Sequence, residues 1–164
     1  MNKGCVRLIL YNLVGPLVLC CGVAALLYLV PWSRIRELAR IGIVGGFGVA
    51  LVIIELMQNL WGFWLFHQVD LVDFYRIPLA LSLTWMPLVI IFSHLMLQYR
   101  QPLLRVGILI VFPAAATIFH FLLLKGGFLT YYRWNLFGTF LFSLIIHAGI
   151  AGYLFLIRSA RTKL

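Results

Sequence analysis

Charged residues are scarce in this chain of 164 residues, since only 10% are Asp, Glu, Lys or Arg. Soluble domains are about 25% charged and about 45–50% apolar, whereas 64% of this chain is apolar. This scarcity excludes a disordered chain, a nucleic-acid-binding domain and an ordinary soluble enzyme. The composition therefore predicts a protein that is surrounded by lipid.

Cysteine and acidic residues are also few. The three cysteines cannot form a disulfide framework, and we interpret Cys5, Cys20 and Cys21 as small apolar packing residues. Four acidic residues stand against 13 basic ones, which gives a net charge of +9. The basic residues are spread between apolar stretches rather than along one stripe, so we predict no nucleic-acid partner.

Five apolar stretches are long enough to cross a bilayer, whose roughly 30 Å hydrocarbon core takes about 20 residues of helix. They occupy residues 8–30, 41–66, 77–97, 106–124 and 136–157. We therefore predict an all-α integral membrane bundle of five transmembrane helices, forming a single transmembrane domain over residues 1–164. The first stretch is longer than the apolar core of a secretory signal, so we expect it to be retained.

Lys and Arg residues between the stretches set the expected orientation. Eight share the side of the first connection, the third connection and the C-terminal tail, and five share the other side. The side with more positive charge is usually cytoplasmic. We therefore expect a multi-pass plasma-membrane protein with its N-terminus outside and its C-terminus cytoplasmic. Tyr and Trp residues at the ends of the stretches are expected to anchor at the lipid headgroups.

Glu55 is the only acidic residue within a predicted span, and a carboxyl group inside a membrane suggests a functional site. Asn59 follows it on the same helix face at i+4. Gly42, Gly46 and Ala50 recur at four-residue spacing, a pattern that lets another helix approach closely. We therefore expect this span at the centre of the bundle. The sequence leaves open whether Glu55 forms one structural hydrogen bond or binds a proton, an ion or a substrate.

Three histidines lie within the spans, yet His94, His120 and His147 differ in depth and lack zinc-binding spacing. We therefore predict no metal site, and we assign no cofactor and no catalytic residue. Depth instead favours two pairs, Glu55 with His147 near mid-membrane and Asn59 with His120 nearer the outside.

Hydroxyl groups recur near two of these histidines. Thr139, Ser143 and His147 are four residues apart in the fifth span, and Thr117 precedes His120 in the fourth. Such groups either hydrogen-bond between helices or together line a small cavity. Ser143 and His147 lack an orienting acid, so hydrolase chemistry is not favoured. The candidate intramembrane polar site comprises Glu55, Asn59, His120, Ser143 and His147.

The second connection contains His67, Asp70, Asp73 and Arg76. Their spacing is unspecific for a divalent metal, so we expect a solvated loop whose charges partly neutralise one another.

Residues 127–136 (GFLTYYRWNL) resemble a segment of an uncharacterised family of small multispanning membrane proteins from spore-forming Gram-positive bacteria. Trp85-x-Pro87 and the connection from Arg100 to Arg105 fit the same family, so the resemblance covers residues 77–153. The family carries an acid near the position that His120 occupies here. The resemblance implies the membrane architecture and a bacterial plasma membrane, and it implies no activity.

Short connections leave little of the chain for a water-soluble catalytic unit. We therefore expect a structural or accessory component of the plasma membrane, with membrane lipids as partners and room for a membrane-protein partner or a homo-oligomer. One alternative is a small proton- or ion-coupled carrier or channel subunit that uses Glu55. A second is a membrane-embedded enzyme acting on lipid, against which the lack of paired carboxylates counts.

Overall fold

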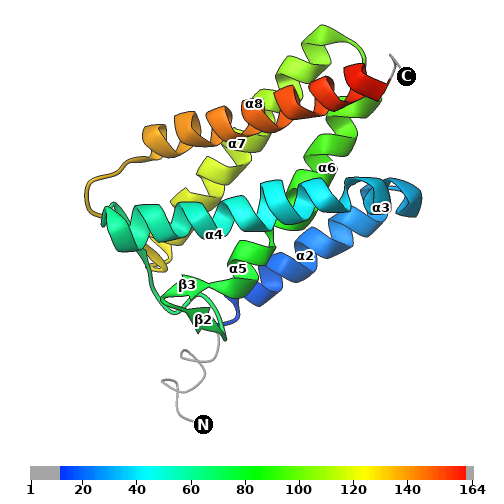
Figure 1. Ribbon diagram of the computed structural model, residues 1–164. Coiled ribbons are helices and arrows are strands. Elements are labelled where there is room, and N and C mark those ends of the chain that lie inside the picture. The colour runs from blue at the N-terminus through cyan, green and yellow to red at the C-terminus, as the bar shows by residue number, and fades with distance from the viewer. Residues whose placement is uncertain (1–11, 162–164) are drawn as a thin grey trace.

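The computed structural model describes the backbone of residues 12–161 and the side chains of residues 12–157. It is mostly helical (Figure 1), with α2 Val14–Leu29, α3 Trp32–Ile41, α4 Val49–Ile54, α5 Leu79–Leu83, α6 Trp85–Gln98, α7 Pro102–Lys125 and α8 Leu136–Arg161. Two π-helical segments, η1 Gly42–Gly48 and η2 Glu55–Leu60, make α3 and α4 parts of one continuous helix. The strands are β1 Trp64–Phe66, β2 Asp73–Phe74, β3 Ile77–Pro78 and β4 Leu129–Tyr131.

Four helices are long and apolar enough to cross a membrane, namely Trp32–Leu60, Leu79–Gln98, Pro102–Lys125 and Leu136–Ile157. The helix α2 has 16 residues and is about 24 Å long at about 1.5 Å per residue, shorter than the roughly 30 Å core. The predicted first span also included residues 8–11, which lie outside the described residues. The structure thus confirms that the chain is mainly helical. Within the described residues, four helices are long and apolar enough to span a membrane.

Two predicted boundaries differ from the structure. Residues 32–40 were expected as a connection, but they form α3, which opens the long helix Trp32–Leu60. That helix was expected to continue to residue 66, but it ends at Leu60, and Gly62 turns the chain with φ of 61°. The residues that follow pair as a strand, with Trp64 opposite Tyr131. Their apolar composition suits a buried strand as well as a membrane helix.

The strands gather at one end of the helices, and α3 with the turn between α6 and α7 lies at the other end (Figure 1). The antiparallel pairing of β1 with β4 ties the chain after η2 to the connection between α7 and α8. This pairing closes the bundle at the strand end.

The hairpin formed by β2 and β3 turns through Tyr75 and Arg76, whose φ angles are 49° and 65°. Two-residue hairpin turns with positive φ at both positions favour Asn and Gly, so other residues there need support from the surrounding structure. Gln58 gives that support from η2. Its Nε2 donates to Arg76 O at 2.7 Å, and its Oε1 accepts from Phe66 N at 2.8 Å.

The small residues of the helix Trp32–Leu60 mark the close approach that the sequence predicts. A Cβ built on Gly42 would lie 2.6 Å from the Ile90 side chain, and one on Gly46 would lie 2.7 Å from Trp85 O. The neighbour is α6. The helix Leu79–Gln98 is more buried than the helix Trp32–Leu60, with 56% of its apolar segment buried, compared with 33%.

Candidate functional site

A cavity of about 400 Å³ lies between the η1–α4 part of the long helix and the helices α6, α7 and α8. Its volume falls within the roughly 300–1,000 Å³ of small-molecule sites. Most of its wall is apolar, with Ala50, Ile54, Leu88, Phe112, Ala116 and Phe119 among the lining residues. The polar groups among the described lining residues are those of Trp64, Thr84, Trp85, His120, Thr139, Ser143 and His147. The cavity therefore combines a hydrophobic interior with a small set of polar contacts.

The helix α8 supplies the polar wall of this cavity. Thr139, Ser143 and His147 all line it, and all three side chains are buried. They are spaced four residues apart, so the stripe extends for about 12 Å along the helix at about 1.5 Å per residue. The sequence leaves open whether these groups hydrogen-bond between helices or line a cavity, and in the structure all three line the cavity.

His147 has a defined hydrogen-bonding state. Its Nδ1 lies 2.7 Å from Ser143 O, and because a carbonyl oxygen only accepts, Nδ1 carries the hydrogen and donates it. A neutral ring then leaves Nε2 as an acceptor. Ser143 Oγ lies 3.3 Å from the same Nδ1. A nitrogen that already holds its hydrogen cannot take the proton of Ser143, so this pair is not arranged as a nucleophile and its base.

His120 belongs to a polar cluster at the strand end of the cavity. Its Nδ1 lies 2.6 Å from Tyr131 Oη, which lies 2.7 Å from Thr139 Oγ1. Trp134 Nε1 also donates to Thr139 Oγ1, at 2.9 Å. Trp64 meets the His120 ring edge-on, with 5.7 Å between ring centroids. The cluster joins β1, α7, β4 and α8 around one set of hydrogen bonds.

Replacing Tyr131 with Phe should destabilise this cluster, because His120 Nδ1 and Thr139 Oγ1 lose their shared partner. A buried group left without its partner costs about 1–3 kcal/mol, and we expect the free energy of unfolding in detergent to fall by that amount. Burial raises the pKa of Tyr131 to about 12. The protonated hydroxyl therefore contributes stability below pH 10 that is lost as the pH rises toward 12, and Tyr131→Phe should lack this loss.

Tyr132 provides the matched control for that variant. Its side chain is 62% exposed, and Tyr132→Phe should change the free energy of unfolding by about 0.5 kcal/mol or less. Equal effects of the two substitutions would contradict a structural role for the Tyr131 hydroxyl.

Glu55 and Asn59 do not line the cavity. Both side chains are exposed, and Asn59 Nδ2 donates to Glu55 Oε2 and to Tyr75 O. Their shared face is as predicted, but the expected pairs of Glu55 with His147 and of Asn59 with His120 are not formed among the described residues. The long helix begins at Trp32 rather than at residue 41. Its midpoint therefore lies near Gly46, and Glu55 sits toward the strand end.

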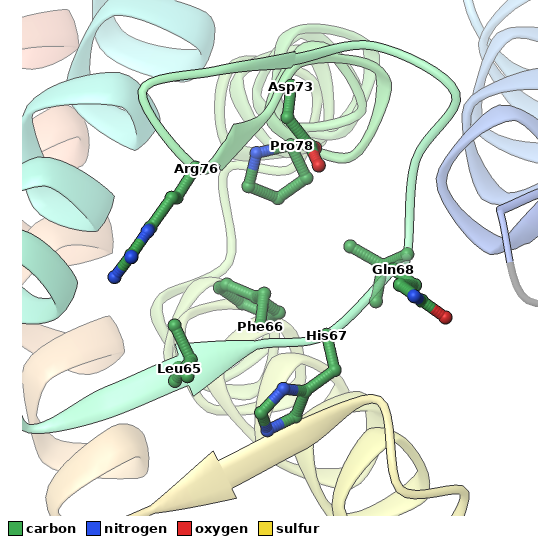
Figure 2. A pocket seen from close by; sticks show the side chains of 8 residues that line it. Leu65, Phe66, His67, Gln68, Asp73, Arg76 and Pro78 are labelled. Carbon is green, nitrogen blue, oxygen red and sulfur yellow. The ribbon is translucent and has the colours of Figure 1, made fainter.

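A second hollow, of about 440 Å³, lies beneath the connection between β1 and β3 (Figure 2). Figure 2 shows the Arg76 side chain extending away from it and the His67 ring turned toward β4, where Nε2 lies 2.9 Å from Thr130 Oγ1. The charged groups of this hollow therefore do not converge on one point. No group of three or more His, Cys, Asp or Glu side chains that could hold a metal ion is found within residues 12–157.

Asp70 departs from the solvated loop that the sequence predicts. Its side chain is 5% exposed, and Oδ2 accepts from Leu81 N at 2.9 Å. Burial raises the pKa of this carboxyl group, although backbone N–H groups partly oppose the effect. Asp70 therefore acts as a buried acceptor for the start of α5 rather than as a surface charge.

Three residues of the polar cluster around His120 and Thr139 were not predicted as site residues. Tyr131 and Trp134 were assigned to membrane anchoring, but both turn toward Thr139. Trp64 was assigned to the second span, but it is 4% exposed, and its Nε1 has no hydrogen-bond partner among the described residues. Only the pairing of β1 with β4 brings these side chains together, and no spacing within the sequence signals that pairing.

Comparisons with known proteins place the chain in no group. No family model, no curated protein and no solved structure matches it. The resemblance carried by residues 127–136 stays a prediction.

Proposed function

We propose that the protein is an accessory membrane protein that binds a lipid-derived, mainly apolar ligand in the cavity lined by α4, α6, α7 and α8. One observation carries this proposal: a cavity of about 400 Å³ that is largely apolar and has a stripe of three buried polar side chains along α8. Sites for small hydrophobic ligands have this composition, in which a few polar contacts fix the orientation of the ligand.

The position of the cavity supports access from lipid. Val111 and Ala115 line it from α7, and both residues are exposed, Val111 by 60%. The wall at α7 is therefore open toward the outer surface of a helix whose length and composition suit a membrane span. A ligand dissolved in the bilayer would enter sideways between helices, without passing through water.

Two other functions fit the geometry less well. A carrier or channel that uses Glu55 would place this carboxyl group on the transport path, whereas Glu55 is exposed and pairs with Asn59 outside the cavity. A lipid-modifying enzyme would need an activated nucleophile, and the hydrogen on His147 Nδ1 prevents it from activating Ser143.

The proposal also covers location and topology. We place the protein in the plasma membrane, and we propose the apolar segment that contains α2 as a fifth crossing. The count of Lys and Arg on the two sides supports a cytoplasmic C-terminus.

Filling the cavity tests the proposal. Bromohexadecane quenches tryptophan fluorescence on contact, and Trp64 and Trp85 line the cavity. Ala116 also lines it, whereas Ala148 is exposed on α8 and does not. In detergent, Ala116→Phe should remove the saturable part of the quenching, and Ala148→Phe should keep it. Quenching without a saturable part in the unsubstituted protein, or equal quenching of both variants, would overturn the proposal.

A further inference from the structure

The hydrogen-bonding state of His147 specifies the chemistry of the ligand's polar group. We infer that the cavity binds a neutral lipid with a free hydroxyl group, such as a long-chain alcohol or a prenol, whose O–H donates to His147 Nε2. This inference rests on the proposed function and adds the ligand class to it.

The His147 ring is oriented by a hydrogen bond to its own helix. Nδ1 donates to Ser143 O, one turn earlier on the same helix, so this edge of the ring faces α8 itself. In an imidazole ring the lone pair of Nε2 points away from the Nδ1–H bond, so Nε2 is directed away from Ser143 O, and the residue lines the cavity. None of the described residues hydrogen-bonds Nε2. An acceptor in this position is complemented by a ligand that brings a donor.

The surroundings of this ring are aromatic and carry no charge among the described lining residues. Phe92, Phe112 and Trp85 contact it, with ring centroids 4.9 Å, 5.9 Å and 6.5 Å away. None of the described residues that line the cavity is Lys, Arg, Asp or Glu. A carboxylate or phosphate group would be buried there without a counter-charge, at a large desolvation cost. The ligand's polar group is therefore neutral.

Neutral polar groups differ in whether they can donate a hydrogen bond. Quinones, esters and ethers present only acceptor oxygens, and an acceptor placed against Nε2 gains no hydrogen bond. A hydroxyl group is neutral and donates one hydrogen. The apolar residues on α4, α6 and α7 then pack against the hydrocarbon chain.

A matched pair of probes tests the inference. Bromine-terminated hexadecanol and its methyl ether differ only at the oxygen, where the ether carries a methyl group in place of the donor hydrogen, and both carry the bromine that quenches the cavity tryptophans. The unsubstituted protein should bind the alcohol up to about tenfold more tightly, the ratio that one net hydrogen bond supplies. His147→Phe keeps an aromatic ring and should bind both probes with the affinity of the ether. His94→Phe, a histidine of α6 outside the cavity lining, should keep the preference.

The binding of the two probes separates failure of the inference from failure of the proposed function. Equal binding of both probes by the unsubstituted protein overturns the inference and leaves the proposed function standing, whereas saturable binding of neither overturns both. A preference retained in His147→Phe overturns the assignment to His147. If His147→Phe does not fold, nitrogen NMR of the histidine-labelled, unsubstituted protein replaces it. The alcohol should shift one Nε2 resonance that the ether leaves unchanged, and identical spectra would overturn the inference.

Discussion

Gly46→Ala is expected to lower the free energy of unfolding by about 1–3 kcal/mol, the usual cost of overpacking a filled interior. The added Cβ would lie 2.7 Å from Trp85 O and 2.8 Å from the Met86 Cα. Both are backbone atoms of α6, so no flexible side chain can move aside. The loss should appear although Ala favours a helix over Gly by about 1 kcal/mol.

Gly45 and Gly48 are the matched controls, since they share the same π-helical segment. A Cβ on Gly45 would first meet the Ile150 side chain at 3.8 Å, and one on Gly48 would meet Ile43 O at 3.5 Å. Both are ordinary contact distances, so Gly45→Ala and Gly48→Ala should be neutral or stabilising. Unfolding in mixed micelles with increasing denaturing detergent measures all three variants. If Gly46→Ala behaved like Gly45→Ala, the close packing of the long helix against α6 would be wrong.

The glycines also show how much of the fold the sequence predicts. Four-residue spacing of Gly42 and Gly46 is a local pattern, and it identifies a helix face that another backbone approaches. It does not identify the partner, which is α6, because that depends on how the whole chain is connected. Apolar length likewise predicts the four long helices. It cannot separate the helix end at Leu60 from the strand Trp64–Phe66, because both are apolar and aromatic.

The candidate site likewise has a part that a local sequence pattern predicts and a part that depends on the whole fold. The stripe of Thr139, Ser143 and His147 follows from helical periodicity, and the structure places it on the cavity wall. Glu55 stands out in the sequence because its charge is rare there, yet rarity does not specify depth. The helix begins earlier than predicted, and this shift moves Glu55 toward the strand end, where Asn59 and the hairpin backbone are its neighbours.

The wall of the cavity opposite α8 includes an irregular helix. The π-helical segment η1 contributes Gly45 and Gly46 to the lining, beside Ala50 of α4. Small residues there leave volume that larger side chains would fill, and π-helical turns often occur at functional sites. Gly46, whose lack of a side chain lets α6 approach closely, thus also lines the cavity, so packing and ligand binding depend on one segment.

Asp70→Asn is expected to remove a pH dependence of stability that the unsubstituted protein shows between neutral pH and about pH 4. Asp70 Oδ1 is buried without a hydrogen-bond partner among the described residues, and burial raises the pKa of the carboxyl group above its ordinary value. The folded state therefore binds a proton at a higher pH than the unfolded chain does. The protonated carboxyl group therefore adds stability near pH 4, and this stability is lost as the pH rises through the raised pKa toward neutral pH.

Two further variants separate the charge of Asp70 from its hydrogen bond. The amide introduced by Asp70→Asn would keep an oxygen that accepts from Leu81 N, so this variant should be at least as stable as the unsubstituted protein at pH 7. Asp70→Ala removes the acceptor and should cost about 0.5–2 kcal/mol at any pH, as loss of a helix-capping group does. Asp73→Asn should weaken this pH dependence without removing it, because burial raises the pKa of Asp73 and its charge also helps to raise the pKa of Asp70. Unfolding in a non-ionic detergent at pH 4 and pH 7 measures these effects, and an Asp70→Asn variant with an unchanged pH dependence would show that another group titrates.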